Sequence, residues 1–302
     1  MSLHKIEETA VTVGEGRWQL PGIVTYPSRV RNPVAAAVLV HGSGPQDEDE
    51  TIGPNKPFRD LAHGLAARGI AVLRYVKRTK QHGEQFVAET DYTWYEETEQ
   101  DACIAVAVLR SQPMVDAGRT FLIGHSLGAT LAPRIAGYAP ALRGVIMLAP
   151  MARKLLDIMD FQFAYLREVN PENVAAIKQL EDAVAMTRKA LAAGAETGRY
   201  MGAPISYWRD VMSYDPVATA AVVTKPMLII QGARDYQVRI DIDFRAFKAG
   251  LQHKCNVDFR SYRDLNHLFI SGSGKPSPAE YAVPGHVAPA VLRDIASWIK
   301  RT

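Results

Sequence analysis

The chain has 302 residues, enough for one large domain or two small ones with a sizeable buried core. Hydrophobic residues make up 47% and charged residues 22%, which sets aside disordered, collagen-like and disulfide-scaffold proteins. Lys and Arg number 35 against 32 Asp and Glu, a net charge of only +3, so neither nucleic acid nor an acidic membrane surface is expected as a partner.

The two cysteines, Cys103 and Cys255, have the spacing of neither a metal knuckle nor a redox pair, and both are expected to be buried free thiols. The N-terminus lacks the apolar stretch of a secretory signal, and no run reaches the roughly 20 apolar residues of a membrane helix. A cytoplasmic protein is therefore expected. The sequence leaves open whether residues 1–3 are native.

Short, β-branched apolar runs alternate with segments of helical spacing from about residue 34 onward. This alternation is typical of βα units on a parallel sheet, and continuously apolar runs indicate strands covered on both faces. One or two antiparallel strands are expected before them, within residues 10–25. The predicted strands of the main sheet are 34–40, 70–75, 120–123, 144–148, 227–230 and 256–262.

Two helices are well marked. A helix over 94–110 is predicted to start at a capping box formed by Thr93 and Glu96. The last helix carries an apolar stripe at helical spacing that should dock on the sheet, formed by Val287, Val291, Ile295, Trp298 and Ile299.

The alternation breaks once, between about 150 and 224, where the sequence becomes helical and rich in Ala, Met and aromatic residues. We interpret residues 151–224 as a helical cap inserted into an α/β core formed by 1–150 and 225–302. Within it, Asn170 and Pro171 indicate the start of a helix and Gly194 its end. Four aromatic residues could line a substrate pocket or simply pack the cap on the core: Phe161, Tyr165, Tyr207 and Trp208.

One segment has the pattern of a nucleophile elbow: the strand run 120–123 leads through Gly-x-Ser-x-Gly into a helix over 130–138. A serine at such a turn has a strained backbone, and the glycines two residues to either side, Gly124 and Gly128, remove side chains that would collide. We therefore predict that Ser126 is a nucleophile. The alternative is a glycine-rich structural turn.

A serine hydroxyl needs a base and a third group that orients the base, and in this type of site the acid and the histidine follow the serine in that order. Of the three later histidines, His267 comes just after the last predicted strand, at the sheet edge where open α/β sheets place active sites. His253 and His286 are expected at the surface. Metal ligation is not predicted for any of them.

The predicted acid is Asp235, in the loop after strand 227–230, where it would accept the ring N–H of His267. Asp258, which lies within a strand, and Asp264, which lies in a turn, are the alternatives.

An oxyanion hole needs two donors, predicted to be the N–H of Leu127 and an N–H of the loop after strand 34–40. In that loop Ser43 is the first candidate and Gly44 the second. His41 is interpreted as a structural histidine of the same loop, and His125 as a structural residue whose side chain points to the other side of the elbow.

In chain order these motifs resemble the α/β-hydrolase superfamily, over nearly the whole chain. Further segments resemble bacterial carboxylesterases with a helical cap, relatives of the dienelactone-hydrolase and acylaminoacyl-peptidase-like groups: 58–62, 72–75, 131–136, 207–210 and 231–238. The resemblance implies an acyl hydrolase of small or medium carboxylic esters. Two departures stand out: Ser126 replaces the cysteine of dienelactone hydrolases, and Val76 replaces the acid of a common Tyr-Asp-Lys-Arg motif.

The sequence thus predicts a serine hydrolase that cleaves small-molecule carboxylic esters through an acyl-enzyme, with no metal or organic cofactor. A serine aminopeptidase, an acylaminoacyl-peptidase-like enzyme or a thioesterase is the alternative on the same machinery, because a triad does not choose among acyl substrates. A non-catalytic ligand-binding module is disfavoured, since such receptors usually lack a triad member. Chain length, leaving group, stereoselectivity and oligomeric state are left open.

Overall fold

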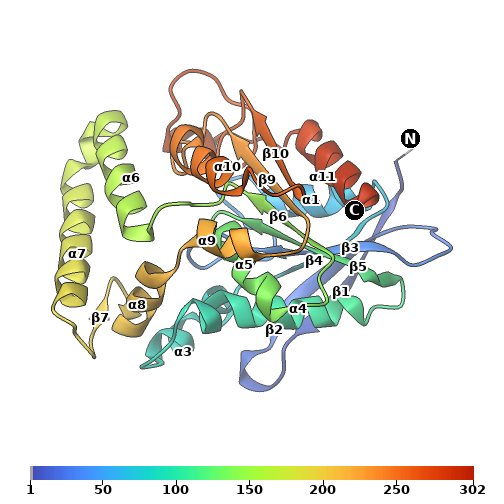
Figure 1. Cartoon of the computed structure of the whole chain (residues 1–302), viewed down its shortest axis with the longest axis horizontal. Coiled ribbons are helices and arrows are strands. Elements are labelled where there is room, and N and C mark those ends of the chain that lie inside the picture. Colours follow the sequence, from blue (N-terminus) through green and yellow to red (C-terminus); the bar gives the residue numbers. More distant parts are fainter. Residues whose placement is uncertain (1–2) are drawn as a thin grey trace.

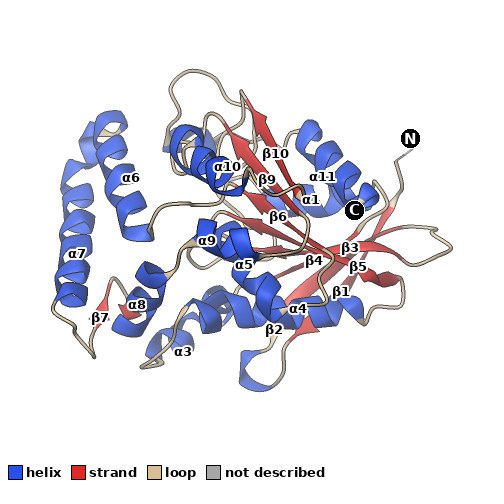
Figure 2. Cartoon of the chain, viewed as in Figure 1, coloured by secondary structure: helices blue, strands red, loops and turns tan. Residues whose placement is uncertain are grey.

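The computed structural model describes residues 3–302; Met1 and Ser2, whose origin the sequence left open, lie outside the described residues. An eight-stranded sheet runs through the centre of the molecule in the order β1-β2-β4-β3-β5-β6-β9-β10 (Figures 1 and 2). β1 and β2 pair antiparallel, β2 joins β4 antiparallel, and the other neighbours are parallel. This mostly parallel sheet between helices confirms the predicted α/β fold.

All six predicted runs of the main sheet form strands, and the two antiparallel strands together extend further at both ends than the predicted 10–25. β5 also begins earlier, at Val115 rather than at residue 120. The strands are β1 (Ile6–Val13), β2 (Leu20–Pro27), β3 (Val34–Val40), β4 (Ala71–Tyr75), β5 (Val115–His125), β6 (Gly144–Leu148), β9 (Met227–Gly232) and β10 (Val257–Tyr262).

The sheet separates two apolar cores because successive side chains of a strand point to opposite faces. In β3, Val38 belongs to the core beneath α4 (Gln100–Arg110), α5 (Leu127–Tyr138) and α10 (Arg245–Leu251), whereas Leu39 belongs to the core beneath α1 (Pro57–Ala66) and α11 (Pro289–Arg301). All five apolar residues of the predicted terminal stripe are buried, which confirms that the last helix docks on the sheet.

The helix predicted from residue 94 begins as expected. The Glu96 carboxylate accepts the backbone N–H of Thr93 at 2.8 Å and its hydroxyl at 2.7 Å. The first turn is a π-helix, η2 (Tyr95–Glu99), which continues into α4. Short elements elsewhere are η1 (Gly16–Trp18), α2 (Arg78–Gln81), α3 (Gly83–Ala88), η4 (Ile240–Phe244) and η5 (Pro278–Ala282).

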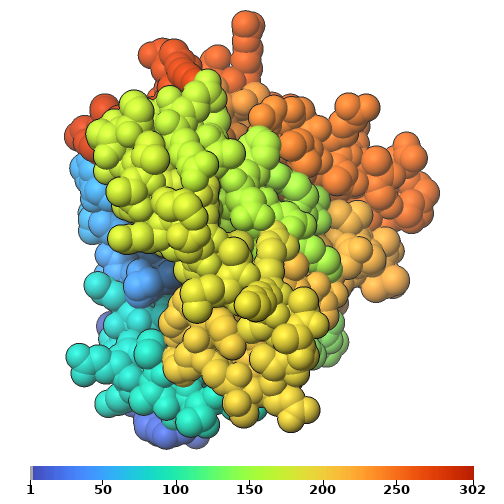
Figure 3. Space-filling view, turned by 90° about the vertical axis from the view of Figure 1, so that its left-hand side faces the viewer, coloured from blue at the N-terminus to red at the C-terminus, as the bar shows by residue number. Residues whose placement is uncertain are grey.

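The segment between β6 and β9 is helical, as predicted. α6 (Leu155–Val169), α7 (Val174–Ala192) and α8 (Ile205–Ser213) pack on one another at the left of Figure 1, and they cover the face turned to the viewer in Figure 3. η3 (Pro171–Asn173) follows Asn170, and Gly194 ends α7 at a φ of 68°. A small hairpin, β7 (Arg199–Tyr200) and β8 (Ala203–Pro204), was not predicted, and α9 (Pro216–Val222) packs on α5 and α10.

Among residues 3–302 no helix is both long and apolar enough to cross a membrane. Cys103 is half-buried on α4, and burial raises the pKa of its thiol to about 11. Cys255 is exposed, so its predicted burial was wrong; it lies in the turn between α10 and β10.

Candidate active site

Ser126 lies at the turn between β5 and α5, in a backbone conformation that L residues rarely adopt, with φ 52° and ψ −113°. The two flanking glycines permit this turn. A Cβ on Gly124 would lie 2.2 Å from the carbonyl oxygen of Gly128, and a Cβ on Gly128 would lie 2.2 Å from the carbonyl oxygen of Val40. The Gly-x-Ser-x-Gly segment therefore forms the strained turn that was predicted from its sequence.

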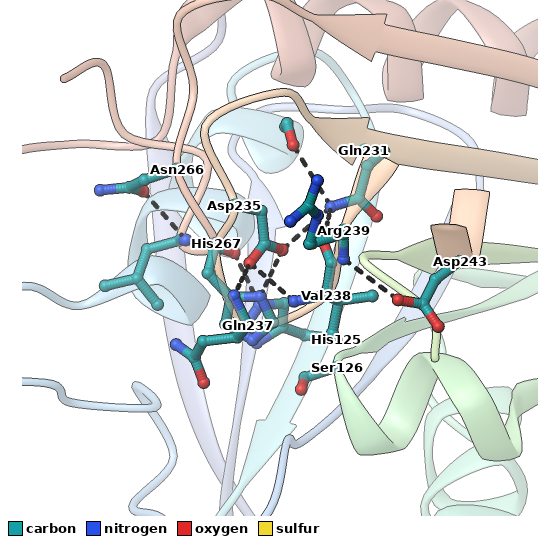
Figure 4. A network of polar contacts seen from close by, with 12 residues as sticks. His125, Ser126, Gln231, Asp235, Gln237, Val238, Arg239, Asp243, Asn266 and His267 are labelled. Atoms are coloured by element: carbon teal, nitrogen blue, oxygen red, sulfur yellow. Dashed lines mark hydrogen bonds and ion pairs between the residues drawn. The ribbon is translucent and has the colours of Figure 1, made fainter. Parts of the chain in front are cut away.

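Asp235 and His267 form a buried hydrogen-bonded pair, with 2.6 Å between Asp235 Oδ2 and His267 Nδ1. The Asp235 side chain is fully buried and accepts three further hydrogen bonds: the N–H groups of Gln237 at 2.8 Å and Val238 at 3.0 Å, and the amide of Gln231 at 2.9 Å (Figure 4). Since the carboxylate can only accept, Nδ1 of His267 carries the proton and Nε2 is left as a base.

Ser126 and His267 line the same cavity, of about 410 Å³. Ser126 follows β5 and His267 follows β10, and the two side chains are brought together because both strands end at the same edge of the sheet. No hydrogen bond joins Ser126 Oγ to the His267 ring within the described chain. In free enzymes such contacts are often long and shorten when substrate binds.

The loop after β3 approaches the elbow closely. A Cβ on Gly42 would lie 3.3 Å from Cβ of Ser126, so a side chain there would press on the serine. Ser43 lines the cavity with Ser126, whereas Gly44, with a φ of 79°, does not. Within residues 3–302 the N–H of Ser43 has no hydrogen-bond partner, and that of Leu127, the first residue of α5, has none within its helix.

The cavity lies between the sheet edge and the insertion. Tyr207 and Trp208 of α8 line it, as the sequence suggested. Phe161 and Tyr165 do not: they line a separate cavity of about 240 Å³, where Tyr165 stacks on Tyr236 at 5.2 Å. The reason is the rotation of α6 about its axis. The face of α6 that points toward Ser126 carries Leu155, Met159 and Gln162.

His125 was expected on the other side of the elbow, and this was wrong. Its ring lines the Ser126 cavity and lies 4.7 Å from the His267 ring, centroid to centroid. Nδ1 of His125 is 2.8 Å from Glu50 Oε2, a buried carboxylate that the sequence analysis did not single out. Glu50 ends an acidic run, Asp47–Glu50, which by composition reads as a solvated loop.

The remaining histidines do not enter the cavity. His41 donates from Nε2 to the carbonyl of Asp47 in its own loop at 3.0 Å, and burial lowers its pKa to about 4. His253 and His286 are exposed.

The alternative acids lie elsewhere. Asp258 pairs with Trp298 and Arg301 of the last helix, and Asp264 is exposed in a turn. Residues 3–302 contain no group of three or more His, Cys, Asp or Glu side chains placed to hold a metal ion.

Comparisons with known proteins agree with this architecture. Residues 37–282 match the alpha/beta hydrolase family. The chain is 41% identical over 300 residues to the esterase EstD of Thermotoga maritima, a match that covers 98% of this chain and 68% of that protein.

Two solved structures share the fold. An esterase of Pyrococcus furiosus has a TM-score of 0.62 at 15% identity, covering 98% of this chain and 91% of that one. The acylaminoacyl peptidase of Pyrococcus horikoshii has a TM-score of 0.63 at 13% identity, covering 98% and 42%. At these identities the two structures show the fold alone. The match over residues 37–282 and the relative at 41% identity show the family: the chain belongs to the alpha/beta hydrolase family.

Proposed function

We propose that this protein is a serine hydrolase that cleaves small to medium carboxylic esters through an acyl-enzyme. The observation that carries the proposal is the buried Asp235–His267 pair, 2.6 Å apart, beside the strained Ser126 turn in one cavity. The relative at 41% identity over 98% of this chain is named an esterase, which favours esters among the possible acyl substrates.

In the proposed mechanism Ser126 Oγ attacks the ester carbonyl carbon while Nε2 of His267 takes the hydroxyl proton. Asp235 holds the ring in the required tautomer and stabilises the imidazolium. The N–H groups of Ser43 and Leu127 donate to the oxyanion. His267 then protonates the leaving alcohol as the carbon–oxygen bond breaks, and a water molecule repeats the sequence on the acyl-enzyme, releasing the acid.

We also propose that the part of the insertion before α9, residues 151–215, acts as a cap over this site. Leu155, Met159 and Gln162 of α6, with Tyr207 and Trp208 of α8, line the cavity from the side opposite Ser126. The segment 216–222 packs on α5 and α10, and so we place the working boundary of the cap before α9. The cytoplasmic location expected from the sequence stays a prediction.

The test is hydrolysis of p-nitrophenyl esters from acetate to decanoate by the wild type and by Ser126→Ala. We expect the variant to fold normally and to lose roughly 10⁴-fold or more in kcat, because the remaining groups have no nucleophile to activate. A Ser126→Ala protein with near-wild-type turnover would contradict the proposal.

A matched amide separates the ester reading from the peptidase alternative. An aminoacyl p-nitroanilide is assayed beside the esters, with a fluorophosphonate to label the serine. Turnover of esters with little anilide cleavage supports the proposal; anilide cleavage in the absence of ester turnover assigns the site to peptides instead.

A further inference from the structure

We propose that Glu50 and His125 form a buried ion pair that positions both the oxyanion-hole loop and the loop of the catalytic histidine. The inference rests on the proposed function, because it assigns these residues a role in the same reaction. Neither residue contacts the reacting atoms in this proposal: each acts through the groups it holds.

The hydrogen bonds define the protonation state of the pair. Nδ1 of His125 is 2.8 Å from Glu50 Oε2, and its Nε2 is 3.0 Å from the backbone carbonyl oxygen of His267. A carbonyl cannot donate, so Nε2 carries a proton, and a second proton lies between Nδ1 and the carboxylate. With that proton on Nδ1, His125 is an imidazolium that faces the Glu50 carboxylate.

Burial alone would lower the pKa of His125, but the charge and hydrogen bond of Glu50 and the His267 carbonyl outweigh it and leave that pKa above its ordinary value. Burial would likewise raise the pKa of Glu50, and the His125 ring and the Gly42 N–H reverse this effect. Glu50 is only 1% exposed and His125 4%, so water screens the pair little.

The second oxygen of Glu50 holds the loop after β3. Oε1 accepts the N–H of Gly42 at 2.6 Å, while Nζ of Lys77 donates to the carbonyl of Gly42 at 3.0 Å. Lys77 is itself paired with Glu97 at 2.9 Å. Both polar groups of Gly42 are therefore occupied, and the next N–H along the chain, that of Ser43, is the one left for an oxyanion.

The pair thus links three segments that lie far apart in the sequence: the loop carrying Ser43, the strand that ends at Ser126 and the loop carrying His267. Glu50 adopts a φ of 51°, an uncommon backbone conformation for a non-glycine residue. Such a conformation persists only where the surroundings hold it, as they do here.

Three substitutions of Glu50 distinguish the effect of its hydrogen bonds to Gly42 and His125 from the effect of its negative charge. In Glu50→Gln the amide oxygen can still accept from Gly42, and the amide nitrogen can donate to a neutral His125 that keeps its bond to His267. Glu50→Asp keeps the charge but is one methylene too short to reach both partners. Glu50→Ala removes every contact of the side chain.

We expect Glu50→Gln to keep kcat within about tenfold of wild type. Glu50→Ala should lower kcat by roughly 10²–10³-fold, comparable to the loss of one oxyanion-hole donor. The kcat of Glu50→Asp should lie between those of the other two variants, and so below that of Glu50→Gln. KM should change less than about threefold in all three variants. Affinity for a trifluoromethyl ketone, whose adduct places an oxyanion in the site, should fall by the same factor as kcat/KM.

Asp101→Ala is the matched control, since it removes an equally buried carboxylate from an ion pair, with Arg78, that does not reach the cavity. It should lower stability in urea but leave kcat unchanged. The proposal is overturned if Ala keeps kcat within threefold of wild type, if Asp outperforms Gln, or if kcat follows stability across all four variants.

If Glu50→Ala does not fold, the order of Gln and Asp decides the question. Failure of the proposed function would look different: wild type would not turn over esters, or Ser126→Ala would stay active, whatever the Glu50 variants do.

Discussion

At the residue scale, the turn that carries Ser126 can form only because its two flanking residues, Gly124 and Gly128, have no side chain. The elbow packs β5, α5 and the end of β3 so closely that two positions have no room for a Cβ, and Ser126 takes up the strain with a positive φ. The hydroxyl is thereby held at the edge of the sheet with a helix N-terminus beside it, where the helix dipole favours negative charge.

Gly124→Ala should therefore destabilise the protein by about 2–4 kcal/mol and abolish ester turnover, because the new Cβ would meet the Gly128 carbonyl at 2.2 Å and α5 would have to move. Urea unfolding and p-nitrophenyl ester hydrolysis measure the two effects. Gly137→Ala is the control: it lies in α5, nothing is within 4 Å of its would-be Cβ, and Ala there should stabilise by up to about 1 kcal/mol. Equal stabilities for the two variants would refute the steric argument.

At the element scale, a partly buried cluster of charged residues holds α8 of the insertion on the core. Arg134 of α5 makes two parallel hydrogen bonds to Asp210 of α8, at 2.7 and 2.9 Å, and also pairs with Glu99 of η2. Trp94 adds a backbone N–H to Asp210 at 3.2 Å and an indole N–H to the hydroxyl of Tyr207 at 2.9 Å. Since Tyr207 lines the cavity, this cluster sets the position of one cavity wall.

Within this cluster, burial raises the pKa of Glu99 from 4.5 to about 7, against the attraction of Arg134. The folded protein thus keeps the Glu99 proton to higher pH than the unfolded chain does. Between about pH 4.5 and 7 the unfolded state binds fewer protons, so stability falls as the pH rises. Relative to Glu99→Gln, wild type should lose up to about 3 kcal/mol across this window.

Urea unfolding of wild type and Glu99→Gln at several pH values from 4.5 to 8 measures this difference, in which the titration of all other groups largely cancels. Parallel stability curves for the two proteins would show that Glu99 is ionised throughout.

At the scale of the whole molecule, the cavity exists only where the insertion meets the sheet edge. One side is formed by residues of the sheet edge, Ser43, Ser126 and His267, and the opposite side by α6 and α8. The apolar residues on that opposite side, Leu155 and Met159 among them, favour an uncharged acyl or alcohol group there.

Met159→Ala should enlarge this side and shift the preferred acyl chain toward longer esters, changing the ratio of decanoate to acetate kcat/KM by roughly tenfold. Met186→Ala applies the same substitution on α7 at a side chain that is 64% exposed, and should leave the ratio unchanged. If both variants keep the wild-type ratio, α6 does not bound the acyl group.

Features that depend only on neighbouring residues could be predicted from the sequence alone. Apolar runs and their spacing were enough to predict the strands and the last helix, because burial against the sheet gives each segment its own spacing of apolar residues. The Gly-x-Ser-x-Gly turn could also be predicted, since the strained serine and both glycines lie within five consecutive residues. The proposed order of Ser126, Asp235 and His267 followed from that turn and from the positions of strand ends.

Features that depend on the rotation of a helix or on burial by distant segments became apparent only in the folded molecule. Phe161 and Tyr165 face away from the Ser126 cavity because packing on α7 and α8 sets how α6 turns about its axis, a quantity with no local signature. Glu50 is buried because β5 and the His267 loop close over it. A carboxylate in an acidic loop reads as solvated until the segments that desolvate it are known, and those segments are 75 and more residues away.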